Sequence, residues 1–254
     1  MGTYALTGGA SGIGACLAKL LLEHGHRVIN VDIKDADIIA DLAEPAGRQA
    51  AVAGVRELAP EGLDGLVPLA GVAGGGPPGT LITALNFFGT VEFVEGLRDL
   101  VAKTQGAIVL LCSNSAPMSA PDDPLVASLL ASNETEALKI AGENDNGMHY
   151  MAGKRALACW MRRNTMAYAG DGIRLNAVAP GPIDTPMTKP LFENPEMAGI
   201  LNCLLDQTPL ARAGQAQEVA RVITFLLSPE SSYVCGSVLY VDGGYDAHTR
   251  SDHI

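Results

Sequence analysis

The stretch Tyr4-Ala-Leu-Thr-Gly-Gly-Ala-Ser-Gly-Ile-Gly14 decides the fold. Four residues suited to a buried strand run directly into a glycine-rich loop, and helical periodicity over 13–23 begins inside that loop. Glycines tolerate positive φ angles and let backbone amides and a helix start approach a pyrophosphate. The stretch therefore predicts a strand, a phosphate-binding turn and a helix, which is the first unit of a nucleotide-binding sheet.

Strands and helices alternate along the rest of the chain, with no internal repeat and no low-complexity linker. The hydrophobic pattern predicts strands at 27–32, 38–42, 63–70, 107–112, 173–178 and 238–241, and helices at 44–58, 82–104, 149–169 and 217–227. Strands separated by helices indicate a parallel sheet. We expect an α/β fold, with residues 1–254 forming a single domain: a doubly wound, Rossmann-like parallel sheet flanked by helices, with ligands at the carboxyl ends of the strands.

Composition excludes several classes of protein. The chain has 254 residues, 48% of them hydrophobic, so it can bury a substantial core. A net charge of -11 without a basic stripe argues against partners such as nucleic acid or an anionic membrane. Five scattered cysteines without a CxxC pair indicate reduced thiols and no metal site. Without a leader or a long apolar run, the chain is expected to be cytoplasmic.

Asp32 ends the second predicted strand, about 20 residues beyond the glycine loop. A carboxylate there would accept hydrogen bonds from a ribose diol and would repel a 2′-phosphate. Ser11 also stands in the loop where a basic residue could have contacted that phosphate. These residues favour NAD over NADP as the cofactor, while the alternative is that Asp32 is only a turn residue at a strand end.

Tyr150 and Lys154 form the run Tyr-Met-Ala-Gly-Lys on a predicted helix. Four residues are about one helical turn, so the phenol and the ammonium would share one face. A fixed positive charge stabilises a phenolate and lowers the pKa of the tyrosine toward the working range of a general base. Alone, the pair would equally fit a solvated helix face.

Together with further motifs, the chain resembles the short-chain dehydrogenase/reductase family over nearly its whole length. The additional motifs are Asp41-Leu42, Ala70-Gly71, Asn86 in Asn-Phe-Phe-Gly, Ser113 after the fifth strand, Asn-Ala-Val-Ala-Pro-Gly at 176–181, and Val-Asp-Gly-Gly at 241–244. Within that family, segments 31–42, 63–66 and 233–236 are most similar to the bacterial 3α-hydroxysteroid dehydrogenase/carbonyl reductase group.

The resemblance implies a catalytic tetrad of Asn86, Ser113, Tyr150 and Lys154. Tyr150 would exchange the proton of the alcohol, and Ser113 would hold the substrate oxygen. Lys154 would bind the nicotinamide ribose and lower the pKa of Tyr150, while Asn86 would kink its helix so that its carbonyl holds a relay water. Ser115 is an alternative to Ser113, which we favour because it follows the strand directly.

The resemblance also implies an NAD site without a metal. Its residues would be Gly8, Ser11, Gly12, Ile13, Gly14, Asp32, Ile33, Asp41, Leu42, Ala70, Gly71, Tyr150, Lys154, Pro180, Gly181, Ile183 and Thr185. Two departures from the family pattern stand out. Pro68-Leu69 replaces the usual pair of asparagines, and residues 33–37 are too few for the helix that usually joins the second and third strands.

Between Ser113 and Tyr150 the chain is longer than in most members of the family. We expect an inserted helical segment at about 116–147, with a helix over 122–143 that can bury Leu125, Leu129, Leu130, Leu138 and Ile140. It could cover the helix surface that many relatives use for assembly, shape the mouth of the site, or be only a surface helix. The resemblance implies a homo-oligomer, a dimer or a tetramer.

A substrate lid is expected at about 182–209. Its apolar residues are Met187, Leu191, Phe192, Met197, Ile200, Leu201, Leu204 and Leu205, and its one basic residue is Lys189. An apolar secondary alcohol or ketone fits this composition, such as a 3-hydroxysteroid or another alicyclic alcohol; alternatively these residues only close the core. Two other functions stay open: an epimerase or dehydratase like the extended branch of the family, and an NAD-sensing binding protein without catalysis.

Overall fold

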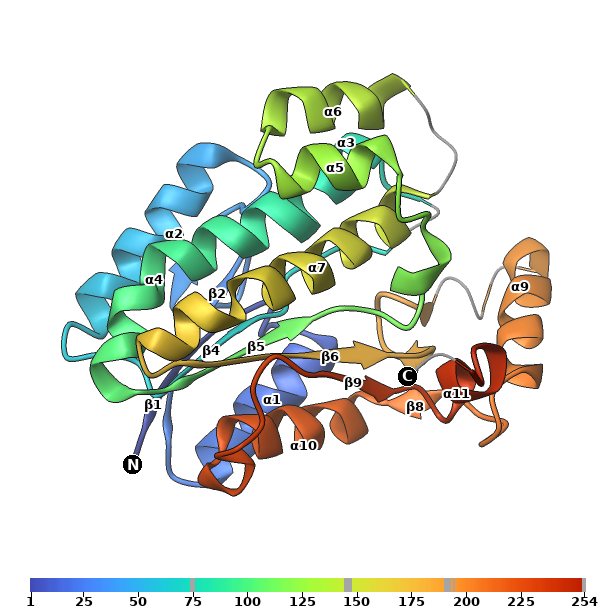
Figure 1. The fold of residues 1–254 in the computed structure, drawn as a ribbon. Helices are drawn as coiled ribbons and strands as arrows, with labels where there is room; N and C mark the ends of the chain where they lie inside the picture. The colour runs from blue at the N-terminus through green and yellow to red at the C-terminus, as the bar shows by residue number, and fades with distance from the viewer. Residues whose placement is uncertain (74–75, 144–147, 190–192, 194, 253–254) are drawn as a thin grey trace.

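A computed structural model describes residues 1–73, 76–143, 148–189, 193 and 195–252. Its centre is a seven-stranded sheet in the order β3-β2-β1-β4-β5-β6-β9 (Figure 1). All of its neighbouring strands pair in parallel. The strands are β1 (Thr3–Thr7), β2 (Arg27–Asp32), β3 (Ile38–Ile39), β4 (Gly65–Pro68), β5 (Ala107–Leu111), β6 (Arg174–Pro180) and β9 (Val238–Val241). The predicted doubly wound parallel sheet is confirmed, although β3 is shorter than expected.

Helices cover both faces of the sheet (Figure 1). One face carries α2 (Pro45–Leu58), α4 (Thr90–Thr104) and α7 (His149–Gly170), and the other carries α1 (Gly12–Glu23) and α10 (Ala216–Leu227). Successive strand residues pack into two hydrophobic cores, one on each face of the sheet. Ala5 of β1 packs on the side of α2, α4 and α7, while Tyr4 and Leu6 pack on the side of α1 and α10. This alternation is the strand period of two, buried on both sides.

The turn between β1 and α1 is packed without spare space. Gly8 has a φ of +73°, and a Cβ added there would lie 2.8 Å from the backbone nitrogen of Ala70. A Cβ on Gly14 would lie 2.1 Å from the carbonyl oxygen of Gly8. The hydroxyl of Thr7 accepts a hydrogen bond of 2.9 Å from Ala70 N. The glycine loop is thus pressed against the segment that follows β4, at the carboxyl edge of the sheet.

The helix predicted over 82–104 is three pieces rather than one. A short helix α3 (Gly79–Thr83) passes into a π-helical stretch η1 (Ala84–Gly89) before α4 begins. Asn86 lies in the π-helical stretch, where its side chain binds the backbone of Val72 twice, accepting from the amide and donating to the carbonyl at 2.9 Å each. A helix that widens to i→i+5 bonding often marks a functional position.

The 116–147 segment contains two helices instead of the one expected. A 3₁₀ turn η2 (Ala116–Met118) leads to α5 (Pro124–Leu130) and α6 (Glu134–Glu143). The helix breaks because Ser132 is left-handed, with a φ of +54°, and Asn133 caps the new helix by accepting from Glu136 N. Leu125 and Leu129 are buried as expected, with α5 packed on α7 and α6 on α3 (Figure 1).

The lid segment is described in part. It contains strand β7 (Ile183–Asp184) and helix α9 (Pro195–Asp206), and β7 pairs in parallel with β8 (Gly214–Gln215), which follows the lid; the sequence did not reveal this pair. Met187 is 45% exposed and Leu201 is buried. The expectations for Leu191, Phe192 and the side chains of Met197 and Ile200 lie outside the described residues. A turn η3 (Pro229–Ser231) and helix α11 (Tyr245–Thr249) complete the chain. Within the described part, no helix is long and apolar enough to cross a membrane.

Replacing glycine by alanine should have opposite effects on stability at Gly14, in the closely packed loop, and at Gly153, in α7. Gly14→Ala should lower the free energy of unfolding by about 1–3 kcal/mol and remove NADH binding, because the new Cβ collides with backbone. Gly153→Ala, in α7 with open space at its Cβ position, should raise that free energy by about 0.5–1 kcal/mol. Urea unfolding of both variants checks this. Equal stability of the two would contradict the packing described.

Candidate active site

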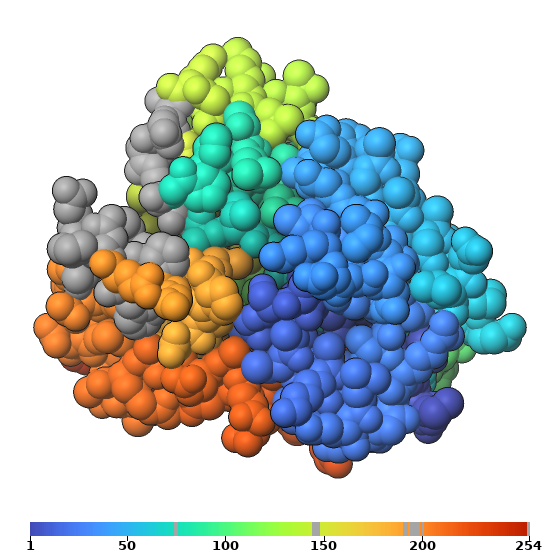
Figure 2. Space-filling view, turned by 180° about the vertical axis from the view of Figure 1, so that it is seen from behind, coloured from blue at the N-terminus to red at the C-terminus, as the bar shows by residue number. Residues whose placement is uncertain are grey.

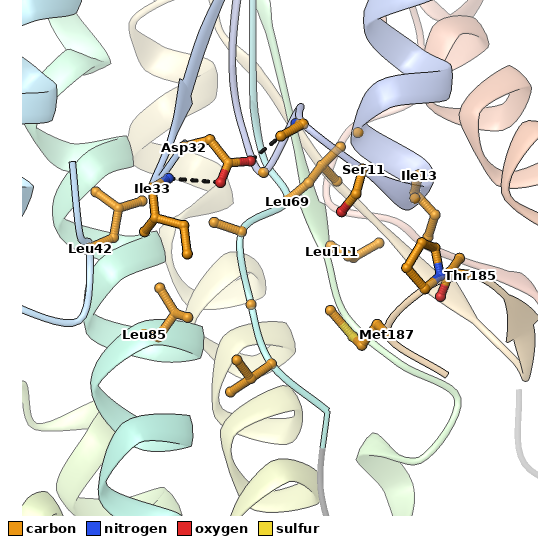
Figure 3. A pocket seen from close by; sticks show the side chains of 18 of the residues that line it. Ser11, Ile13, Asp32, Ile33, Leu42, Leu69, Leu85, Leu111, Thr185 and Met187 are labelled. Carbon is orange, nitrogen blue, oxygen red and sulfur yellow. Dashed lines mark hydrogen bonds between the residues drawn. The ribbon is translucent and has the colours of Figure 1, made fainter. Parts of the chain in front are cut away.

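A cleft of about 340 Å³ opens at the carboxyl ends of the strands (Figure 3). Seen from behind, the blue N-terminal part and the yellow-orange segment at residues 180–188 border it (Figure 2). Nearly all the residues expected to bind the cofactor or to catalyse line it: Gly8, Ser11, Gly12, Ile13, Gly14, Asp32, Ile33, Asp41, Leu42, Ala70, Gly71, Ser113, Tyr150, Pro180, Gly181, Ile183 and Thr185. Lys154 and Asn86 are buried behind its wall, at 6% and 2% exposure.

Further lining residues were not anticipated. They are Ala10, Val31, Lys34, Ala40, Leu69, Val72, Leu85, Leu111, Cys112, Pro186 and Thr188; Met187, expected in the substrate lid, also lines the cleft. Most are immediate sequence neighbours of expected ones, so a rule that strand ends line the cleft would have found them. Leu85 is not at a strand end: it precedes Asn86 in the π-helical stretch, so that rule would have missed it.

Two side chains of β2 hold the glycine loop. Asn30 Oδ1 accepts a hydrogen bond from Gly9 N at 2.9 Å, and Asp32 Oδ2 accepts one from Ala10 N at 3.1 Å. Asp32 Oδ1 accepts from its neighbour Ile33 N at 2.7 Å (Figure 3). A carboxylate has about four acceptor positions, so Asp32 can still accept bonds from a diol. Asn30, in the middle of an apolar strand, was missed by the sequence reasoning.

The start of α1 fits a pyrophosphate. Ser11 is the N-cap of this helix and makes no side-chain cap bond. The amides of the first helical turn therefore keep their hydrogen-bonding capacity, and the positive end of the helix dipole faces the cleft that Gly12, Ile13 and Gly14 line. In Figure 3, Ser11 and Ile13 stand on one side of the cleft and Ile33 and Leu42 on the other. The residues present therefore fit a dinucleotide.

Ser113 and Tyr150 meet at the other end of the cleft. Ser113 follows β5 directly, is 8% exposed, and has its hydroxyl 2.9 Å from that of Ser115. Of the two serines, Ser113 lines the cleft. Lys154 lies one turn beyond Tyr150 on α7, with Nζ 5.6 Å from the centre of the tyrosine ring, and donates a hydrogen bond of 2.7 Å to Leu111 O.

Burial is the largest influence on the pKa values of Tyr150 and Lys154. Burial raises the pKa of Tyr150, and hydrogen bonding with Ser113 opposes that shift. Burial also lowers the pKa of Lys154 to about 8. The expected lowering of the tyrosine pKa by Lys154 is therefore not found here. The ammonium is directed to the carbonyl of Leu111, and the cost of burying the phenolate exceeds its benefit from Ser113.

The arrangement can exchange a proton with a small molecule. It offers a phenol and a serine hydroxyl side by side, next to a nucleotide-type loop in the same cleft. Within the described ranges, no group of three His, Cys, Asp or Glu side chains could hold a metal ion. The groups that line the cleft can supply acid–base chemistry beside a bound dinucleotide.

Comparison with known proteins agrees with this geometry. A family model described as enoyl-(acyl carrier protein) reductase matches residues 8–246. The 3-alpha-hydroxysteroid dehydrogenase/carbonyl reductase of Comamonas testosteroni is 34% identical over 258 residues, which cover 98% of each protein. The cis-4-hydroxycyclohexanecarboxylate dehydrogenase of Sinomonas cyclohexanicum is 34% identical over 95% of each.

A solved structure is also similar. It is the crystal structure of the 3-alpha-hydroxysteroid dehydrogenase from Pseudomonas sp. B-0831 complexed with NADH. That protein is 40% identical, with a TM-score of 0.94 over 99% of this chain and 100% of the other. Segments 31–42, 63–66 and 233–236 resemble the 3α-hydroxysteroid dehydrogenase/carbonyl reductase group. The Comamonas protein has this full name, and the Pseudomonas protein has its first part.

The lowered pKa of Lys154 predicts a pH-dependent cost to stability. Below pH 8 both the folded and the unfolded chain carry the charge, and the folded chain bears the full burial cost of about 3 kcal/mol. Above pH 8 the folded chain loses the proton first, so the free energy of unfolding rises until the unfolded lysine also deprotonates. Lys154→Met should therefore be more stable than the unmodified protein at pH 7, with a smaller advantage at pH 10. Urea unfolding at both values measures this, and a difference that does not change with pH would contradict it.

Proposed function

Because the chain belongs to the short-chain dehydrogenase/reductase family, we propose that it interconverts an apolar secondary alcohol and its ketone with NAD as the cofactor. It is an NAD-dependent oxidoreductase. One observation carries the proposal: a single cleft joins the glycine loop, Asp32 and the Ser113–Tyr150 pair. A cofactor held along the loop would bring its reactive end to the two hydroxyl groups.

The proposed cofactor site follows the cleft from Asp32 to Tyr150. The helix start at 12–14 would hold the pyrophosphate, Asp32 the adenosine ribose, and Lys154 the other ribose. Ala70 and Gly71 would pack along the adenosine, and Pro180, Gly181, Ile183 and Thr185 would flank the nicotinamide. When bound, NAD supplies the hydride acceptor for oxidation, and NADH supplies the donor for reduction.

The proton passes through Tyr150 in the proposed reaction. In oxidation the phenolate oxygen takes the hydroxyl proton of the alcohol, and the C–O bond becomes a carbonyl as the carbinol carbon loses its hydrogen with both electrons. In reduction the phenol returns that proton to the oxygen. Ser113 donates a hydrogen bond to the same oxygen and so stabilises the charge that develops on it.

Two buried residues support this exchange in our proposal. Lys154 stabilises the phenolate once its ammonium turns from Leu111 O toward the ribose and Tyr150. Asn86 holds the π-helical stretch in place through Val72, so that its own carbonyl can bind a relay water. Ser115 orients Ser113 through the hydroxyl contact of 2.9 Å.

The substrate proposed is an alicyclic alcohol, steroid-like or monocyclic. Met187 lines the cleft, Leu201 is buried in α9, and Lys189 pairs with Glu193 at 3.5 Å, so the described part of the lid presents little free positive charge to an anion. The names of two relatives, a hydroxysteroid and a hydroxycyclohexanecarboxylate dehydrogenase, both indicate an alicyclic alcohol, although the second substrate also carries a carboxylate. We also propose that residues 1–254 act as one NAD-binding domain with a lid at 182–209, as a cytoplasmic homo-oligomer.

Asp32 predicts the choice of cofactor. The unmodified protein should use NAD far better than NADP, because the carboxylate at the end of β2 repels a 2′-phosphate. Asp32→Ala should narrow the ratio of kcat/KM for the two cofactors by about tenfold or more. Steady-state kinetics with each cofactor measures the ratio. Equal use of both by the unmodified protein would refute the assignment.

A substrate panel tests the proposed function. We expect the highest kcat/KM for a 3-hydroxysteroid or a substituted cyclohexanol, and lower values for a short linear alcohol and a 3-hydroxyacyl thioester. Each methylene buried under the lid could add about 0.8 kcal/mol to binding. NADH fluorescence follows each reaction. A clear preference for the linear alcohol or the thioester would reject the alicyclic substrate, and no turnover with any alcohol would reject the function.

A further inference from the structure

Arg48 is a charged side chain buried inside the protein. It lies in the first turn of α2 and is 1% exposed. Neither the proposed reaction nor the cofactor site uses it. A buried guanidinium is costly to the fold unless all its donors are satisfied, so its partners show what its position depends on.

On one side, Arg48 binds the chain that forms the cleft wall. Its Nε donates to Leu42 O at 3.0 Å, and one Nη donates to Ala43 O at 3.0 Å. Asp41 and Leu42 line the cleft at the end that carries Asp32 (Figure 3). With the pyrophosphate at the loop and Tyr150 at the far end, this is the adenosine end of the cleft.

On the other side, Arg48 binds two carboxylates. Glu92 of α4 accepts from Nη1 at 2.7 Å, and Glu134 accepts from both Nη atoms, at 2.9 and 2.6 Å. Glu134 is the first residue of α6, within the 116–147 segment. The first turn of α6 lies beside α2 (Figure 1). One guanidinium therefore joins the cleft wall, α4 and the inserted helix pair.

The Leu42 carbonyl has little room to move. A Cβ added to Gly89, which ends η1 and is the N-cap of α4, would lie 2.8 Å from Leu42 O, so this junction packs directly against the oxygen that Arg48 binds. Phe88 lies under the guanidinium at 5.8 Å. Burial alone would lower the pKa of Arg48, but the hydrogen bonds and charges of Glu134 and Glu92 raise it. Arg48 therefore keeps its positive charge. A lysine could not make the same set of hydrogen bonds, because its ammonium lacks the planar arrangement of donors of a guanidinium.

We propose that Arg48 is a positioning residue for the adenosine end of the cofactor site, and that Glu134 acts through it, so that the 116–147 segment supports cofactor binding. The inference rests on the proposed NAD-dependent function. It gives the inserted segment a role in holding residues 41–43 in place, at a distance from the reacting atoms. Removing one partner of such a buried group leaves an uncompensated charge or unpaired donors and acceptors, and without Arg48 the carbonyls of Leu42 and Ala43 lose the donors that bind them.

The test compares three variants by titration with NADH and with ADP-ribose, which lacks the nicotinamide. Arg48→Met and Glu134→Gln should each weaken both ligands by about three- to tenfold. Arg56→Met is the matched control, because Arg56 also joins α2 to α4, through Asp99 at 2.6 Å, but both groups are exposed and neither lines the cleft. The control should bind both ligands within about twofold of the unmodified protein.

Kinetics and hydrogen exchange separate positioning from general loss of stability. In Glu134→Gln the KM for NAD should rise while kcat at saturating NAD stays within about twofold, because Tyr150 and Ser113 are untouched. The rate of amide hydrogen exchange should increase more at residues 41–44 than in α2 or α4. Glu134→Gln removes the charge but keeps the shape of the side chain and one accepting oxygen, and the Glu134 side chain is 27% exposed, so this variant still tests the proposal if Arg48→Met fails to fold.

Two results would overturn the inference alone: unchanged binding of NADH and ADP-ribose by folded Arg48→Met and Glu134→Gln, or equal weakening in Arg56→Met. Failure of the unmodified protein to bind NADH would overturn the proposed function together with the inference. The two failures are therefore distinguishable in one set of titrations.

Discussion

The hydrogen bonds that hold the glycine loop against the sheet are the constraint on which the rest of the structure depends. Asn30 and Asp32 of β2 accept hydrogen bonds from the amides of Gly9 and Ala10, and Thr7 fixes Ala70 on the other side. With Gly14 packed against a carbonyl oxygen, the loop has one position available. That position directs the start of α1 into the cleft, and it makes the cleft continuous from Asp32 to Tyr150. Arg48 likewise holds the backbone carbonyls of Leu42, which lines the cleft opposite the loop, and of its neighbour Ala43.

At the end of the cleft proposed for catalysis, buried ionisable groups lower the stability of the fold. Burial raises the pKa of Tyr150 and lowers that of Lys154, so both charged forms are disfavoured in this structure. A protein under selection for stability alone would place apolar side chains here. Retaining a phenol, an ammonium and a serine in one buried group fits a site whose task is to move a proton, with the environment adjusted when substrate and cofactor bind.

The sequence predicted the sheet because each strand is a short apolar run bounded by glycine or polar residues, and such local patterns survive in the fold. It also predicted most of the cleft, because strand ends converge at one edge. It failed where tertiary contacts decide. The π-helical stretch around Asn86 depends on Val72. The break at the left-handed Ser132 is a different case, because the cap that Asn133 makes is local and this signal in the sequence was overlooked. The partners of Arg48 come from segments far apart in the sequence, so no local pattern reveals them, and the sequence overestimated the effect of Lys154 on Tyr150 because it contains no measure of burial.

The central claim is that Tyr150 carries the proton of the reaction. The most direct measurement is turnover of Tyr150→Phe with a substituted cyclohexanol, made beside an NADH titration of the same variant. Removing only the phenolic hydroxyl should reduce kcat by about 10²–10⁴-fold and leave NADH affinity nearly unchanged. Turnover close to that of the unmodified protein would contradict the account, whatever the affinity for NADH.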